Sequence, residues 1–418
     1  MTGRSILRFE SKSWGAGIRF AFCLAAAAQA AGAYSFLTHE AVVDLAWEGS
    51  LKPAVASRFP AATGEDLRRA HAFAYGGSVI QDLGYYPFGN KFFSDLTHYA
   101  RTGDFVKALL SQSQTVDEYA FALGALAHYA GDAYGHPAVN MAVALHNPRI
   151  KPQFGAQVTY EQNKPAHLRV ELGFDMYQVV QKRYAPDDYR GAVGFEVADE
   201  LLDRAFRQTY GLALSDVFAQ PGLAIGSYRF AISQVLPEIT KAAILDRNDQ
   251  LIAERPGFAR DQFLFIISRA AYQREWGKEY RRPHWWARAL AFLLRRLPKG
   301  GALNALDFVN PTQQTEGYFM ESVVSTVRQF EEYVQRQQDG RLELKNWNLD
   351  TGRDVAPAEY HLADETYAQL VGRLAASDFS TMDAALKENV LGFYAGSAEE
   401  RKPAAWHKVK AKLKPLLR

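Results

Sequence analysis

Residues 127–137, A-H-Y-A-G-D-A-Y-G-H-P, place His128, Asp132 and His136 at intervals of four. In an α-helix such positions lie on one face and drift by only about 40° per step. At a rise of about 1.5 Å per residue the two histidines are about 12 Å apart along the axis. One zinc ion, with ligand bonds of roughly 2.0–2.2 Å, cannot easily hold both. The stretch therefore predicts a helix serving two or more metal ions, with Asp132 as a shared carboxylate.

A second helical stripe repeats the pattern with His167, Glu171 and Asp175. A single His-x-x-x-Asp pair is more typical of a helix surface, but two such stripes favour metal binding. Clustered histidine and carboxylate without cysteine is typical of a catalytic rather than a structural zinc site. Seven of the ten histidines fall in one part of the chain, namely His39, His71, His98, His128, His136, His146 and His167.

The first 33 residues have the pattern of a secretory signal peptide. A basic start precedes the apolar run Phe20 to Ala30, which is too short to span a bilayer comfortably. Ala31-Gly32-Ala33 is a small-x-small cleavage site that would leave Tyr34 as the first mature residue. Ala28-Gln29-Ala30 is a competing site, and an uncleaved anchor is the other alternative. We therefore expect a secreted or periplasmic protein.

The composition excludes several classes of protein. A net charge of +2 over 418 residues gives no general case for a nucleic-acid partner. The only cysteine, Cys23, lies within the expected signal, so the mature chain would have no disulfide. Asp350-Thr351-Gly352 occurs once, whereas an aspartic protease needs two such motifs in a strand-rich fold.

The chain reads as helical nearly throughout, which predicts an all-α fold. Thr115-Val-Asp-Glu118 is a capping box that begins the helix carrying His128, and Pro137 is expected to help end it. Asn163 and Pro165 begin the helix of the second stripe. Apolar spacings of three and four predict further helices over residues 195–216, 222–246, 257–275, 313–337, 359–375 and 380–394.

From Tyr34 to about Tyr184 the chain resembles the zinc-dependent phospholipase C family. That family is related to the single-strand-specific zinc nucleases and to the front domain of GPI-specific phospholipase D. The motifs come in the family's order: Tyr34-x4-His39, Gly77-Ser-x3-Asp82, His98 in Phe93-Ser-Asp-Leu-Thr-His98-Tyr, His128-x3-Asp132, His136, and His167-x3-Glu171.

The resemblance implies an all-helical domain with a site for two to three zinc ions. One ion would be held by His98, His128 and Asp132, with Asp82 as ligand or proton acceptor. A second would be held by His136, His167 and Glu171. The third would be held by His39, Asp132 and the amino and carbonyl groups of Tyr34.

The chain departs from the family's pattern at several positions. Tyr34 replaces the usual first tryptophan, which matters little because the ligand is a backbone group. The eight residues from His128 to His136 match the phospholipase D branch rather than the ten common in bacterial members. His146, in the long stretch before the second stripe, is a rival ligand. His71 has no counterpart, and we interpret it as a histidine on a helix surface.

The resemblance also implies the chemistry. We expect hydrolysis of a phosphodiester by a zinc-bound water that Asp82 orients or deprotonates. The preferred substrate is a phospholipid at a membrane surface, which would be cleaved to diacylglycerol and a phosphorylated head group. The alternatives are a single-strand-specific nuclease, a GPI-type phospholipase D, and a non-catalytic metal- or membrane-binding helical protein.

The organisation expected from these patterns is a signal peptide over 1–33, a catalytic domain over 34–235 and a helical region of unknown role over 236–418. Within the last region, Trp285 to Leu297 has an apolar face beside several arginines. Such a stretch could lie on an anionic membrane or pack as a helix with a solvated basic rim. The mixed basic and aromatic residues of 269–299 could also bind single-stranded nucleic acid.

Overall fold

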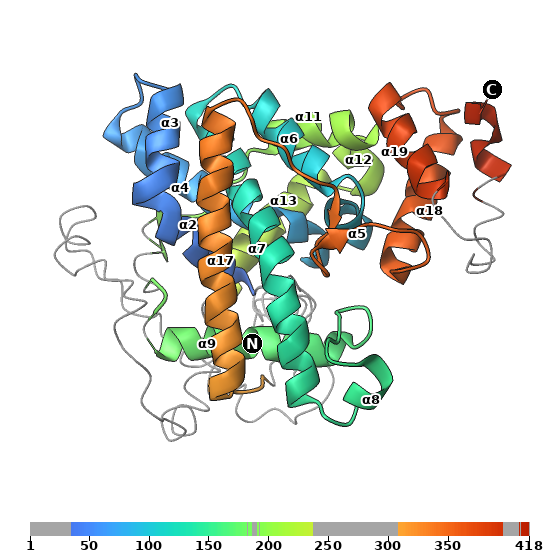
Figure 1. The fold of residues 1–418 in the computed structure, drawn as a ribbon. Helices are drawn as coiled ribbons and strands as arrows, with labels where there is room; N and C mark the ends of the chain where they lie inside the picture. Colours follow the sequence, from blue (N-terminus) through green and yellow to red (C-terminus); the bar gives the residue numbers. More distant parts are fainter. Residues whose placement is uncertain are drawn as a thin grey trace, which may run out of the picture.

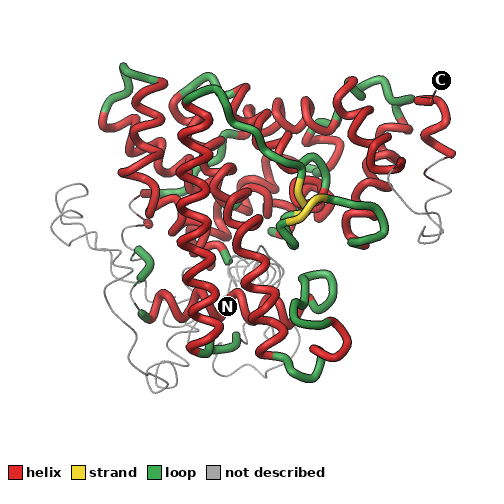
Figure 2. Tube along the Cα trace, in the orientation of Figure 1, coloured by secondary structure: helices red, strands yellow, loops and turns green. Residues whose placement is uncertain are grey.

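The computed structural model confirms the predicted all-α fold. Strand pairing within the described residues is confined to β1 (Trp347–Asn348), which pairs antiparallel with β2 (Arg353–Asp354) and appears as a short crossing among the helices in Figure 2. The predicted signal peptide, Tyr34 and the basic stretch 285–297 lie outside the described residues, which are 35–181, 183–185, 190–191, 193–236, 308–395, 409 and 411–417.

The fold is built around α7 (Val116–His146), which is buried along most of its length. It packs against α4 (Gly64–Ser78) and against α17 (Gln313–Gln338), which runs beside it in Figure 1. Helices α4 and α7 can approach closely because each has a glycine that packs against a backbone carbonyl of the other. A Cβ on Gly77 or Gly124 would lie within about 2.1 Å of that carbonyl oxygen. This contact brings the end of α4 beside the middle of α7.

The remaining elements surround this centre. Helix α2 (Phe36–Ala46) and α9 (Lys164–Val180) also contact α7, and α5 (Lys91–Tyr99) follows the 3₁₀ turn η2 (Ile80–Tyr85). The other elements are η1 (Trp47–Leu51), α3 (Lys52–Arg58), α6 (Thr102–Gln112), α8 (Lys151–Phe154), α11 (Asp199–Tyr210), α12 (Leu214–Val217), α13 (Pro221–Phe230), η3 (Ala231–Val235), α18 (His361–Ala376), α19 (Ala384–Ala395) and η6 (Lys414–Leu417).

The predicted helix starts are confirmed at two caps. The Thr115 hydroxyl accepts a hydrogen bond from the Glu118 N–H at 3.2 Å, and the Asn163 side chain accepts one from the Ala166 N–H at 3.1 Å. Each cap satisfies a backbone donor that the first helical turn leaves without a partner. These local bonds fix where α7 and α9 begin.

The prediction that Pro137 helps to end the helix was wrong, because α7 continues to His146. A proline lacks the N–H that would bond to the carbonyl four residues earlier, here that of Ala133. Gly352 packs at this notch: its φ is +64°, and a Cβ there would lie 2.3 Å from the Ala133 oxygen. Packing around the buried helix therefore outweighs the local cost of the proline.

An irregular segment of residues 344–354, here called the strap, ties the later part of the chain to the helical centre. Leu344 and Leu349 are buried in the core that also contains α7 residues. The Tyr129 hydroxyl donates to the Lys345 carbonyl at 2.8 Å, and the Thr102 hydroxyl donates to the Trp347 carbonyl at 2.8 Å. The strap crosses the ends of α5 and α6 and the middle of α7. The predicted boundary at residue 235 between a catalytic domain and a C-terminal region stays a prediction.

Among the described residues, none of the helices combines the length and the apolar character needed to cross a bilayer.

Candidate metal centre

Three groups of buried histidines and carboxylates lie along one side of α7. The first cluster is Asp82, His98 and His128, the second is His136, His167 and Glu171, and the third is His39, His128 and Asp132. Within each cluster the potential ligand atoms all lie within 4.8 Å of one another. His128 belongs to two clusters, while His136 is two helical turns further along and belongs to a different one.

The first cluster forms where η2, α5 and α7 meet. The Nε2 atom of His98 lies 3.4 Å from Asp82 Oδ1 and 3.1 Å from Asp132 Oδ2. His128 Nε2 lies 3.1 Å from the same Asp132 oxygen. One carboxylate oxygen therefore faces two imidazole nitrogens from different helices.

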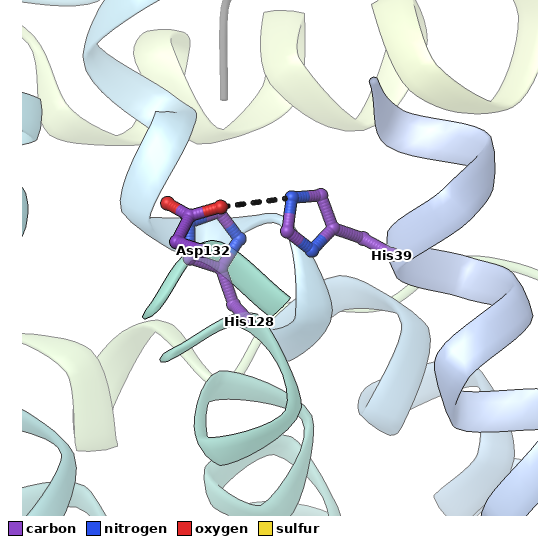
Figure 3. A group of neighbouring side chains, drawn as sticks. All are labelled: His39, His128 and Asp132. Atoms are coloured by element: carbon purple, nitrogen blue, oxygen red, sulfur yellow. Dashed lines mark ion pairs between the residues drawn. The ribbon is translucent and has the colours of Figure 1, made fainter. Parts of the chain in front are cut away.

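The third cluster uses the other oxygen of Asp132. His39 reaches in from α2, and its Nε2 lies 3.4 Å from Asp132 Oδ1 (Figure 3). The imidazoles of His39 and His128 are stacked with centroids 4.2 Å apart. Because its two oxygens face different histidines, Asp132 has the geometry of a carboxylate shared between two cations.

The second cluster joins α7 to α9. His167 Nδ1 lies 2.9 Å from Glu171 Oε1, and the His167 ring centroid is 5.5 Å from that of His136. Both of these ligand atoms are buried, yet neither makes a hydrogen bond. Buried polar atoms without hydrogen bonds are costly, and a bound cation would satisfy them.

Each of four imidazoles donates a hydrogen bond away from its cluster. Because carbonyl oxygens only accept, the bonded nitrogen carries the proton and the other nitrogen can offer its lone pair to a metal. The donors and acceptors are His98 Nδ1 to Ser94 O at 2.7 Å, His128 Nδ1 to Ser78 O at 2.9 Å, His136 Nδ1 to Leu349 O at 2.6 Å, and His167 Nε2 to Asn140 Oδ1 at 2.8 Å.

Burial and neighbouring charge set the protonation of the ligands. Burial lowers the pKa of His167 to about 4, which favours the neutral, metal-binding imidazole. Burial raises the pKa of Glu171 well above its ordinary value. The pKa of Asp132 is well below its ordinary value because the charge and hydrogen bonds of His128, His39 and His98 outweigh the effect of burial. A divalent cation at the second cluster would stabilise the carboxylate of Glu171.

The donor set fits zinc. Ligands on a tetrahedral ion with bonds of roughly 2.0–2.2 Å are about 3.3–3.6 Å apart. The distances from His98 and His39 to their carboxylate neighbours are 3.1–3.4 Å. Imidazole and carboxylate without thiolate is the ligand class of catalytic zinc sites.

The structure brings together eight of the residues proposed from the sequence, while Tyr34 lies outside the described residues. The rival His146 is in the last turn of α7, where its Nε2 lies 3.0 Å from the Thr315 hydroxyl, and it belongs to none of the three clusters. The eight are His39, Asp82, His98, His128, Asp132, His136, His167 and Glu171.

The interpretation of His71 as a surface histidine was wrong. It is buried between α4 and α2, where its Nε2 lies 3.0 Å from Asp44 Oδ1 and its ring stacks on Trp47 with centroids 4.0 Å apart. The face of α4 that packs on α2 therefore includes His71 as well as the apolar residues of α4.

Sequence reasoning missed one residue beside the centre, Asp350 of the strap. It is buried, and its Oδ1 lies 3.6 Å from His136 Nε2. Asp350 is the first residue of Asp350-Thr351-Gly352, a motif that was considered only for an aspartic protease. A local spacing signal could not have found it, because His136 lies more than two hundred residues earlier in the chain.

Residues 38–219 match the family model described as zinc dependent phospholipase C. Comparison with curated proteins and with solved structures gives no match. The matched segment contains all eight of the residues gathered at the clusters and excludes the strap.

Proposed function

Residues 38–219 belong to the zinc-dependent phospholipase C family, and from this we propose that the protein is an exported phospholipase C. The coarser assignment, a zinc-dependent hydrolase of phosphodiesters, follows from the family and from the clusters of buried histidines and carboxylates. The proposed substrate is a phospholipid, cleaved to diacylglycerol and a phosphorylated head group.

One observation carries the proposal: Oδ2 of Asp132 faces His98 and His128, while its Oδ1 faces His39. A carboxylate placed in this way can join two cations, and closely spaced cations stabilise both the entering and the leaving oxygen of a phosphodiester displacement. We assign one ion to the first cluster with Asp132, one to the second and one to the third. The third ion depends on the free amino group of Tyr34, so the proposed total is two to three zinc ions per chain.

Asp82 is the proposed proton acceptor. Its Oδ1 is buried and makes no hydrogen bond, so it is available to orient a water molecule in the first cluster. In the reaction a water oxygen forms a bond to phosphorus and a proton of that water passes to Asp82. The bond from phosphorus to the glycerol oxygen breaks, and the proton held by Asp82 is transferred to that oxygen, which gives diacylglycerol. Bound zinc would supply charge neutralisation for the phosphate and a lower pKa for the water.

The third ion would use the amino group of Tyr34, so it depends on cleavage of the signal peptide. The chain just after that residue is held in place: Asp175 accepts hydrogen bonds from the Leu37 N–H at 3.0 Å and from the Thr38 hydroxyl. This anchoring supports a fixed first residue beside His39. N-terminal sequencing of exported protein should read Tyr-Ser-Phe-Leu-Thr-His, and an uncleaved chain would remove the basis for this ion.

The function is tested by a substrate panel with purified, zinc-loaded protein: phosphatidylcholine vesicles, a GPI-anchored protein and single-stranded DNA. We expect release of diacylglycerol and a phosphomonoester head group. Turnover should be lost in Asp82→Asn and unchanged in Asp199→Asn. Asp199 is an exposed carboxylate at the start of α11 and serves as the control.

Other outcomes of the panel would contradict the proposal. Phosphatidic acid as the product would indicate a phospholipase D. Cutting of single-stranded DNA without lipid turnover would indicate a nuclease with the same metal architecture. Zinc binding with no turnover of any substrate would leave a non-catalytic metal- or membrane-binding protein.

A further inference from the structure

The strap places the carboxylate of Asp350 beside the second cluster, although the strap lies outside the segment that matches the family model. Asp350 is 4% exposed, and its Oδ1 lies 3.6 Å from the Nε2 of His136. Its other oxygen, Oδ2, accepts hydrogen bonds from the hydroxyls of Tyr99 at 2.8 Å and Tyr360 at 2.5 Å. Two phenol donors on one oxygen fix the carboxylate and leave the other oxygen directed at His136.

The backbone around Asp350 is bonded to the helices that supply the ligands. The Leu349 N–H donates to the His98 carbonyl at 3.0 Å, and the Leu349 carbonyl accepts from His136 Nδ1 at 2.6 Å. The Asp350 carbonyl accepts from the Asn140 amide at 2.9 Å, and the oxygen of that amide accepts from His167. The strap therefore contacts His136 directly and His167 through one side chain.

The facing atoms of His136 and Asp350 are not hydrogen-bonded to each other. His136 donates its Nδ1 proton to the Leu349 carbonyl, which leaves Nε2 as the nitrogen that can bind a metal. Asp350 Oδ1 lies opposite at 3.6 Å, beyond hydrogen-bond distance. A cation between the two atoms would interact with both. The separation is close to that of two ligands on one zinc ion, roughly 3.3–3.6 Å.

We propose that Asp350 is a fourth protein ligand of the second metal ion, beside His136, His167 and Glu171. It adds a second negative charge to this cluster, which favours a divalent cation over a vacant site. The inference depends on the proposed function only for the identity of the ion as zinc, and it does not depend on the substrate.

The test compares Asp350→Asn with Asp354→Asn in the full mature chain. Asp354 is an exposed carboxylate of the same strap, bonded to the Trp347 indole N–H at 3.1 Å, so its variant controls for the loss of a strap carboxylate. Zinc stoichiometry is measured by elemental analysis and zinc affinity by chelator competition. In Asp350→Asn we expect one ion to bind at least 10–100-fold more weakly, the range seen when metal-site partners are removed, and in Asp354→Asn no change.

Equal affinity for every ion in Asp350→Asn and wild type would overturn the proposal. If Asp350→Asn does not fold, Asp350→Glu and Asp350→Gln replace it, because these two differ only in charge. We expect the glutamate variant to retain the ion and the glutamine variant to lose it, whereas equal binding by both would overturn the proposal. Since the readout is metal binding, lack of lipid turnover in wild type would refute the proposed function and leave this inference intact.

Discussion

Replacing Asp132 with asparagine should remove two metal ions at once. Asparagine lacks the negative charge that both ions would share, which weakens both sites, and its one remaining oxygen cannot face the histidines of the first cluster and His39 together. In His136→Ala, by contrast, only the second cluster loses a ligand. The two variants therefore differ in the number of clusters they damage.

The expected loss of stability follows from the linkage between metal binding and folding. An ion held at a free concentration of one hundred times its Kd stabilises the folded state by about 2.7 kcal/mol. Loss of two such ions in Asp132→Asn should lower the zinc-dependent part of the unfolding free energy by about 5 kcal/mol. Loss of one ion in His136→Ala should lower it by about 2.7 kcal/mol.

The assay is urea unfolding of each protein in zinc-buffered solution and again with a chelator, so that only the zinc-dependent increment is compared. Elemental analysis of the same samples gives the number of ions lost. If the increment falls by no more in Asp132→Asn than in His136→Ala, the idea of a shared carboxylate is refuted.

Three further predictions concern catalysis, pH and packing. Asp82→Asn should keep much of its zinc but lose turnover by about 10²–10⁴-fold, the range for loss of a general base. Elemental analysis and initial-rate measurements on the same protein test this. A parallel loss of zinc would instead show that Asp82 acts mainly as a ligand. Burial raises the pKa of Asp175 from 3.8 to about 6, so its neutral form stabilises the fold below pH 3.8 and that contribution is lost as the pH rises through 6. The unfolding free energy of wild type relative to Asp175→Asn should then fall by on the order of 3 kcal/mol over that window, and a difference independent of pH in urea titrations would contradict it. Gly352→Ala should lower the unfolding free energy by at least about 1–2 kcal/mol because of the positive φ, and by more because of the close contact with Ala133. Gly340→Ala, with a φ of +68° and no neighbour within 4 Å, should lower it only by the amount due to φ. Equal losses of stability in thermal unfolding would exclude an effect of the contact.

The parts of the fold that the sequence predicted are those set by short-range physics. The cap at Thr115 and the spacing of the stripe both act within a few residues, so the start of α7 and the shared face of its ligands could be inferred locally. The separation of His128 and His136 into different clusters followed from the helical rise alone.

Other features could not be predicted because they depend on contacts across the chain. Pro137 does not end α7, since the packing of Gly352 at Ala133 is invisible to a local reading. His71 is buried because α4 packs on α2. Asp350 lies in a motif with no spacing typical of a metal site, and only the folded strap places it beside His136.

The strap also imposes an order of events during synthesis. The carbonyl that accepts the His136 proton belongs to a residue 213 positions later in the chain. At about 5–20 residues per second a ribosome needs roughly 10–40 s to add that many residues. Once Glu171 has been added, the nascent chain contains every ligand of the matched segment, but the carbonyl that accepts the His136 proton is still missing. Full assembly of the second cluster therefore waits for the late part of translation, and a product truncated before the strap would reach its destination with an unfinished metal centre.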